Sequence, residues 1–192
     1  VKDITNGEIV PHYFAGFSRT TIEIVDFANR IFEGRFPKSY KLPEAVLRHG
    51  DEVGILEYDK DIKDLEKDKI KELVNLIKEQ FNKGAVTCAL LCRNRDHADN
   101  LYTIFKEYED VIERQVVSYK EFDYKGGLQI LPIENAKGLE FDSVIFADLN
   151  SNYYEDKELD IRLLYVGITR ALHRVFVVTK KNDSITEVLL KN

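Results

Sequence analysis

The chain has 192 residues, of which 44% are hydrophobic and 32% are charged, so it is long enough to bury one substantial core. Its 34 acidic residues against 28 Lys and Arg give a formal net charge of -6, which excludes a histone-like polycation and a long disordered tail. The apolar runs are far shorter than the ~20 residues that span a bilayer, and no leader pattern opens the chain. We expect a soluble, cytoplasmic protein with no membrane partner.

The two cysteines, Cys88 and Cys92, lie in one strand-like run, which separates them by roughly 13 Å and excludes a disulfide between them. They do not form a CxxC pair, and the four histidines show no spacing typical of metal ligands, so we expect no metal site. The chain begins with Val1 and contains no methionine. We interpret it as a fragment of a longer protein.

Short apolar segments alternate with helix-like periodicity along the whole chain, without an internal repeat or a linker. Most of these segments are continuously apolar, which is typical of a parallel sheet covered by helices on both faces. Alternation of this kind predicts a single α/β domain over residues 1–192 with right-handed crossovers. We expect strands at 9–13, 53–58, 86–93, 114–118, 128–133, 144–149 and 174–179.

Four helices are predicted between these strands. The first begins with Thr20 and Glu23 as a capping box, and Gly34 lies just past its end. The last is apolar almost all round, so we expect it to be buried. This last helix covers residues 157–172, and the other two cover residues 61–82 and the segment from Asp96.

Two arginine-containing segments lie where ligands often bind. Arg19 precedes the expected helix start at Thr20, and a helix N-terminus with an added guanidinium is a plausible phosphate site. A solvated loop arginine is the alternative. Residues 92–96 follow a strand at its carboxyl end, where open α/β sheets place ligands, but a plain strand-to-helix turn capped by Asp96 is the favoured interpretation.

Two further segments combine charged residues with an unusual local pattern. In the loop at 135–142, Gly138 can let the backbone approach a ligand while Lys137 and Glu140 contact phosphate or hydroxyl groups; an ordinary charged loop is the alternative. In 159–170, Arg170 continues the helical spacing of Leu159, Leu163 and Val166. A cation on an apolar stripe needs an anionic partner, which is either a structural carboxylate or a ligand.

Taken in order, three segments resemble motifs IV, V and VI of the second RecA-like domain of UvrD/Rep-type (superfamily 1) helicases. Ser18-Arg19-Thr20, with Ile24 and Ala28-Asn29 following, is similar to motif IV. Residues 137–142 followed by Val144 are similar to motif V, and residues 164–171 are similar to motif VI. The resemblance implies a RecA-like sheet and spans nearly the whole chain.

The resemblance also implies roles for four residues. Arg19 and Arg170 would act as arginine fingers on the γ-phosphate of ATP bound to the neighbouring first RecA-like domain. Glu140 would accept a hydrogen bond from the ribose, and Gly138 would let the chain pass close to the nucleotide. The sequence has no GxxxxGK[ST] loop, so ATP and Mg²⁺ would be bound mainly by the first domain, and the isolated chain would be inactive.

Several departures from the family pattern bear on function. Ser18 replaces the tyrosine that stacks on adenine, and Pro132 and Glu134 replace the Thr and His of motif V that are associated with the nucleic-acid strand. The interval from Arg93 to Lys137 is too short for the extra domain that UvrD and Rep insert there. The short interval, Pro132 and the stretch 136–142 together resemble the HelD-like branch, whose members act on RNA polymerase.

Three functional hypotheses remain open from the sequence. The first is the motor half of an ATP-dependent helicase or translocase acting on single-stranded or partly duplex DNA. The second is a module of a HelD-like, RNA-polymerase-associated ATPase that acts by protein binding and remodelling. The third is an unrelated phosphate-binding α/β domain that shares only the sheet.

Overall fold

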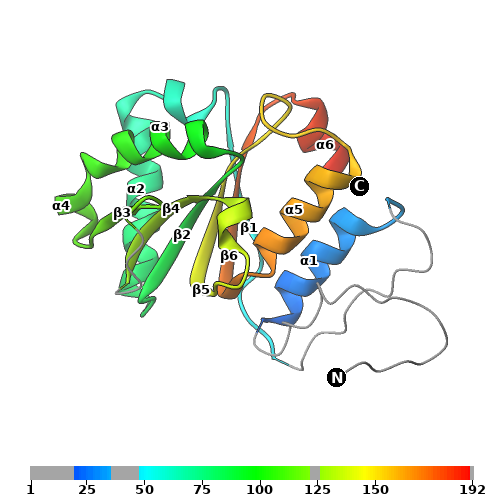
Figure 1. The fold of residues 1–192 in the computed structure, drawn as a ribbon, viewed down its shortest axis with the longest axis horizontal. Coiled ribbons are helices and arrows are strands. Elements are labelled where there is room, and N and C mark those ends of the chain that lie inside the picture. The colour runs from blue at the N-terminus through cyan, green and yellow to red at the C-terminus, as the bar shows by residue number, and fades with distance from the viewer. Residues whose placement is uncertain (1–19, 36–47, 122–125, 191–192) are drawn as a thin grey trace.

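The computed structural model describes residues 20–35, 48–121 and 126–190. Six strands form one sheet in the order β1-β6-β5-β2-β4-β3, and every pair of neighbouring strands is parallel. The sheet separates two groups of helices (Figure 1). The strands are β1 (Gly54–Tyr58), β2 (Thr87–Cys92), β3 (Val116–Ser118), β4 (Gly127–Pro132), β5 (Phe141–Leu149) and β6 (Ala171–Lys180).

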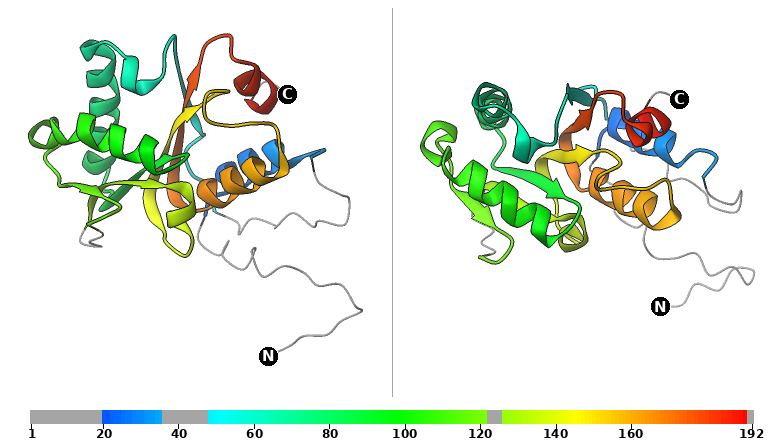
Figure 2. Two further views of the ribbon diagram at one scale, coloured as in Figure 1. Left: turned by 45° about the horizontal axis from the view of Figure 1, so that its top comes forward. Right: turned by 90° about the horizontal axis from the view of Figure 1, so that it is seen from above.

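Helices cover both faces of this sheet. One face carries α1, η3, α5 and α6, and the opposite face carries η2, α2, α3 and α4, as both views in Figure 2 also show. The α/β architecture expected from the sequence is therefore confirmed. The helices are α1 (Ile22–Phe32), η2 (Ile62–Asp64), α2 (Lys67–Asn82), α3 (Arg95–Lys106), α4 (Glu109–Ile112), η3 (Ile133–Ala136), α5 (Glu158–Ile168) and α6 (Ser184–Leu190).

The central strand β2 explains why the strands read as continuously apolar. Ala89 and Leu91 pack in the cluster beneath α1 and α5, whereas Cys88 and Leu90 pack in the cluster beneath α2 and α3. All four side chains are at most 1% exposed. A strand whose two faces are both covered needs apolar residues at every position, as in other parallel sheets.

The cysteines behave as the sequence predicts. Cys88 and Cys92 are buried and free, so no disulfide joins them. Burial raises the pKa of the Cys88 thiol to about 12 and raises that of Cys92 as well, which keeps both thiols protonated and unreactive. The described residues contain no group of His, Cys, Asp or Glu side chains that could hold a metal ion. None of the helices in the described part of the chain is long and apolar enough to cross a membrane.

Two predicted helix starts are wrong. The N-cap of α1 is Thr21, not Thr20, and its side chain makes no capping hydrogen bond. Glu23 does not complete a capping box either, because its carboxylate accepts hydrogen bonds from the backbone N–H of Gly50 and from the ring of His49. At α3 the cap is Asn94, whose side chain accepts from the backbone of His97; Asp96 lies within the first turn.

Helices predicted as continuous also differ from those observed. The helix expected over 61–82 is divided into η2 and α2, with Leu65 extended between them. The helix expected over 157–172 ends at Ile168, because β6 begins at Ala171. It is not buried all round, since Leu159 is 65% exposed. The strand expected at 9–13 lies outside the described residues.

Candidate functional site

The amino ends of the parallel strands bring the motif V-like and motif VI-like segments together. Phe141, the first residue of β5, lies in register with Ala171, the first residue of β6. The backbone N–H of Phe141 donates to the carbonyl oxygen of Arg170 over 2.9 Å. The loop that carries Gly138 and Glu140 therefore lies directly beside Arg170 at one edge of the sheet.

The start of α1 joins the same edge. Thr20 is 2% exposed, and its hydroxyl donates to the carbonyl oxygen of Ala171 over 2.8 Å. Farther along, α1 packs on α5 through the rings of Phe32 and Tyr165, whose centroids are 4.2 Å apart. In Figure 1 the start of α1 and the last turn of α5 lie beside the same ends of β5 and β6. Arg19, the residue before Thr20, lies outside the described residues.

Arg170 is half-buried, but not on the helical stripe that its spacing predicted. It follows the end of α5, and Leu159 of that supposed stripe is exposed to solvent. Its Nε donates to the carbonyl oxygen of Val166 over 3.1 Å, and one terminal nitrogen donates to the Thr169 hydroxyl over 3.3 Å. Burial lowers the pKa of Arg170, and the negative charge of Glu140 opposes that shift.

The guanidinium of Arg170 retains hydrogen-bonding capacity for a ligand. A guanidinium carries five N–H donors, and only two nitrogen-to-oxygen contacts link it to the described residues. Within those residues it forms no ion pair with a carboxylate. The nearest carboxylate influence is the charge of Glu140, which acts on Arg170 without forming an ion pair with it, so the remaining N–H donors are available to a ligand.

The backbone conformation at position 138 requires a glycine. Its φ is +83°, in the region that side chains other than glycine rarely adopt, and a Cβ added there would meet no atom within 4 Å. The turn is closed by the N–H of Leu139, which donates to the carbonyl oxygen of Ala136 over 3.0 Å. Lys137, Gly138 and Glu140 are exposed at this turn, so a ligand can reach both charged side chains and the glycine backbone.

The fourth segment, residues 92–96, is a structural turn at the opposite edge of the sheet. Arg93 forms an ion pair of 2.6 Å with Asp160 of α5, whose side chain is 8% exposed. The ring of His97 lies 2.9 Å from a carboxylate oxygen of Asp148, and the other oxygen accepts the N–H of Ile62. These contacts tie α3 and α5 to the sheet, as in a strand-to-helix turn, but the turn is capped by Asn94 rather than Asp96 and Nε of Arg93 is buried without a hydrogen-bond partner among the described residues.

Sequence reasoning missed the charged residues beside the amino edge that are not part of any recognisable motif. Arg48, His173 and Arg174 line a pocket there together with Asp142. No spacing rule links position 48 to position 174, because only the pairing of β1 with β6 brings these parts of the chain together. Two arginines in otherwise irregular or strand-like segments give no pattern from which a site can be inferred.

Comparisons with known proteins cover the segments that form this site. Residues 127–178 match the family model described as UvrD-like helicase C-terminal domain, and this range includes the loop with Gly138 and Glu140 as well as Arg170. The C-terminal domain of a possible DNA helicase from Lactobacillus plantarum WCFS1 is similar over 90% of this chain and 92% of its own, with a TM-score of 0.67 and 22% identity. This likeness shows the fold, an α/β RecA-like domain.

A second solved structure is RecG bound to a three-way DNA junction. It has 10% identity and a TM-score of 0.47, over 79% of this chain and 20% of its own. A search of curated proteins gives no match.

Proposed function

We propose that this chain is the second, C-terminal RecA-like motor domain of an ATP-dependent DNA helicase or translocase. In this proposal it closes on a first RecA-like domain that binds ATP and Mg²⁺, in the cytoplasm and in the same polypeptide. Arg170 and Arg19 contact the γ-phosphate, Glu140 contacts the ribose, and Gly138 lets the backbone approach the nucleotide. Cyclic closure drives movement along single-stranded or partly duplex DNA.

The observation that carries the proposal is the convergence of three distant segments at one edge of the sheet. Two hydrogen bonds, Phe141 to Arg170 and Thr20 to Ala171, hold the glycine loop, the arginine and the start of α1 together. A site that receives a phosphate chain from a neighbouring domain needs donors from several segments presented on one surface. Arg170, half-buried and without a carboxylate partner among the described residues, is the donor best suited to that task.

In this proposal the positive charge of Arg170 stabilises the negative charge that develops during phosphoryl transfer. ATP bound on the partner domain supplies the phosphoanhydride whose cleavage spreads negative charge over the transferred group. A partly desolvated guanidinium stabilises that charge more strongly than one in bulk water, because less solvent screens it. Its hydrogen bonds to Val166 and Thr169 hold its position before the partner domain closes.

The direct test is ATP turnover by the polypeptide that contains both RecA-like domains. Arg170→Ala is expected to reduce kcat by about 10³-fold or more, in the range of a lost arginine finger. Arg95→Ala is the matched control, because Arg95 is exposed at the start of α3 on the opposite edge of the sheet. Unchanged turnover in Arg170→Ala would refute the proposal.

One observation favours a second candidate, a module of a HelD-like, RNA-polymerase-associated ATPase. The described residues between Arg93 and Lys137 form α3, α4, β3, β4, η3 and the short turns between them, with no additional domain among them. Glu134 is exposed on η3, and a carboxylate there disfavours a nucleic-acid phosphate. Capture of purified RNA polymerase together with absent strand separation would favour this candidate; robust strand separation without capture would exclude it.

A further inference from the structure

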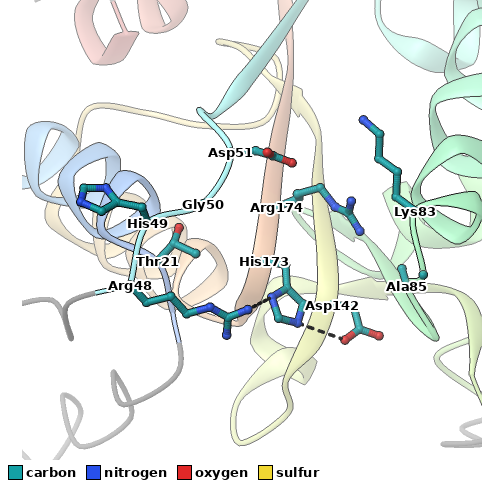
Figure 3. Close-up of a pocket in the computed structure, with 11 residues that line it drawn as sticks. Thr21, Arg48, His49, Gly50, Asp51, Lys83, Ala85, Asp142, His173 and Arg174 are labelled. Atoms are coloured by element: carbon teal, nitrogen blue, oxygen red, sulfur yellow. Dashed lines mark hydrogen bonds and ion pairs between the residues drawn. The ribbon is translucent and has the colours of Figure 1, made fainter.

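A pocket of about 320 Å³ lies at the amino edge of the sheet, beside the proposed ATP half-site. Four parts of the chain form it: Thr21 at the start of α1, the turn Lys83–Ala85 after α2, the starts of β5 and β6, and the segment that leads into β1 (Figure 3). Gly138, Glu140 and Arg170 do not line it. The pocket is therefore separate from the site proposed for ATP, and its volume suits a small molecule.

Arg174 is the central cation of this pocket. It lies on β6 and is half-buried, and its side chain points across the pocket toward the Lys83–Ala85 turn (Figure 3). Its one hydrogen bond to the described part of the chain is long, at 3.4 Å, from Nε to the hydroxyl of Ser143. Within the described residues it forms no ion pair, so a partly desolvated guanidinium faces the pocket with most of its donors available.

A second arginine enters from the segment before β1. Arg48 donates from a terminal nitrogen to Nδ1 of His173 over 2.9 Å. A guanidinium can only donate, so Nδ1 must be the acceptor and the proton of a neutral His173 lies on Nε2. That nitrogen faces Asp142 at 3.8 Å, and the ring is thus held between Arg48 and Asp142 (Figure 3). The hydrogen bond to His173 thereby holds the guanidinium of Arg48 at the wall of the pocket.

Two carboxylates, Asp142 and Asp51, also line the pocket, but within the described residues neither forms an ion pair with Arg48 or Arg174. One oxygen of Asp142 accepts the backbone N–H groups of Val86 and Thr87, at 2.7 and 2.9 Å, and the Thr87 hydroxyl at 3.3 Å. These bonds direct that oxygen toward the start of β2, and the other oxygen faces His173. Asp51 is exposed at the rim, and Lys83, the third cation, pairs with Glu79 outside the lining.

We propose that this pocket binds the phosphate group of a small molecule, with Arg174 and Arg48 as its ligands and Lys83 at the rim. Two guanidinium groups that approach from different segments of the chain suit the tetrahedral oxygens of a phosphate, and neither forms an ion pair with a carboxylate of the described residues. The pocket exceeds the volume of a phosphate ion, so it accommodates either free phosphate or a phosphomonoester with a small organic group. This site does not depend on ATP hydrolysis by the neighbouring domain.

The test is calorimetric titration of the 192-residue chain with inorganic phosphate at low ionic strength, with sodium chloride as the ionic-strength control. One saturable site is expected, and its affinity should fall as salt is added. Arg174→Gln should weaken binding about 10-fold or more, as expected for loss of a charge-assisted hydrogen bond. Arg95→Gln, on the opposite edge, should leave binding unchanged.

A second ligand distinguishes free phosphate from a phosphomonoester, and a second variant keeps the test valid if the first does not fold. Ribose 5-phosphate binding more tightly than inorganic phosphate would identify a phosphomonoester as the ligand, and the reverse order would identify free phosphate. Arg48→Gln changes an exposed residue outside the sheet and should also weaken binding if Arg174→Gln does not fold. No saturable binding, equal binding by the Arg174 and Arg95 variants, or binding of an oligonucleotide only would overturn the proposal.

Discussion

The hydroxyl of Thr20 donates a hydrogen bond of 2.8 Å to the carbonyl oxygen of Ala171, although the two residues lie 151 positions apart. Both residues are buried, at 2% and 0% exposure. The bond fixes the start of α1 against the start of β6. It therefore connects the motif IV-like and motif VI-like segments through residues that neither resemblance singles out as ligands.

Replacing Thr20 with valine tests this connection. The side chain keeps its shape but loses the donor, which leaves a buried carbonyl oxygen without that partner, and we expect the free energy of unfolding to fall by about 1–3 kcal/mol. Urea denaturation measures the change. Thr103→Val is the control, because the Thr103 hydroxyl is exposed and bonds only within its own helix. Equal losses in the two variants would contradict a specific role for Thr20.

Arg170 should contribute little to the stability of the fold if it is reserved for a ligand. It is partly desolvated, and the described residues give it no carboxylate partner, so Arg170→Leu should change the free energy of unfolding by no more than about 0.5 kcal/mol in either direction. Chemical denaturation of the two proteins decides the question. A loss of about 3 kcal/mol or more would mean that Arg170 belongs to a buried ion pair.

Glu23 should make the stability depend on pH in the acidic range. The hydrogen bond from His49, together with that from Gly50, lowers the pKa of Glu23 from 4.5 to about 2. Since the folded-state pKa lies below the unfolded one, this contribution is fully present above the unfolded value of 4.5 and is lost as the pH falls toward 2.

The measurement is the free energy of unfolding for the natural chain and for Glu23→Gln across that range. The difference between the two proteins should be largest near neutral pH and should shrink as the solution becomes more acidic than pH 4.5. A difference that stays constant with pH would show that Glu23 acts through its shape alone.

Asp183 should stabilise the carboxyl-terminal helix. One carboxylate oxygen accepts from the backbone of Ile185 and Thr186 at the start of α6, and both oxygens bond to Ser151. Burial opposes ionisation, but these hydrogen bonds outweigh it and lower the pKa of Asp183. Asp183→Ala should cost about 2 kcal/mol, at the upper end of N-cap losses.

Thermal denaturation compares this variant with Ser184→Ala, which removes an exposed neighbouring side chain and should change the melting temperature much less. Asp183→Asn should retain part of the stability, because an amide oxygen can still accept from the helix N–H groups. If Ser184→Ala were as destabilising as Asp183→Ala, the capping role would be excluded.

The architecture could be predicted from the sequence because a strand buried on both faces needs apolar residues at consecutive positions, and such runs can be recognised in the sequence. Leu90 and Leu91 are neighbours in β2 that point to opposite sides of the sheet, and both must be apolar. The helix ends were harder to predict, since several nearby residues can cap equally well. Thr20 and Asp96 both have side chains that can cap a helix. The Thr20 hydroxyl instead donates to the carbonyl oxygen of Ala171, and at α3 the side chain of Asn94 accepts the backbone N–H that a cap binds.

The candidate site was only partly predictable for a related reason. Gly138, Glu140 and Arg170 belong to recognisable segments, and the structure brings those segments together; Arg19 lies outside the described residues. The spacing that placed Arg170 on a helical stripe was misleading, because the helix ends at Ile168 and the chain turns into β6. The pocket around Arg174 and Arg48 depends on tertiary contacts alone, so the sequence contained no signal for it.

The measurement that tests the central claim most directly is the single-turnover rate of ATP cleavage by the two-domain polypeptide carrying Arg170→Ala. If Arg170 acts on the transition state, the rate falls by about 10³-fold or more while the affinity for ATP changes only a few-fold. Arg170→Lys should recover little of the rate, because an ammonium group cannot reproduce the planar fork. A rate equal to that of the unaltered protein would contradict the account.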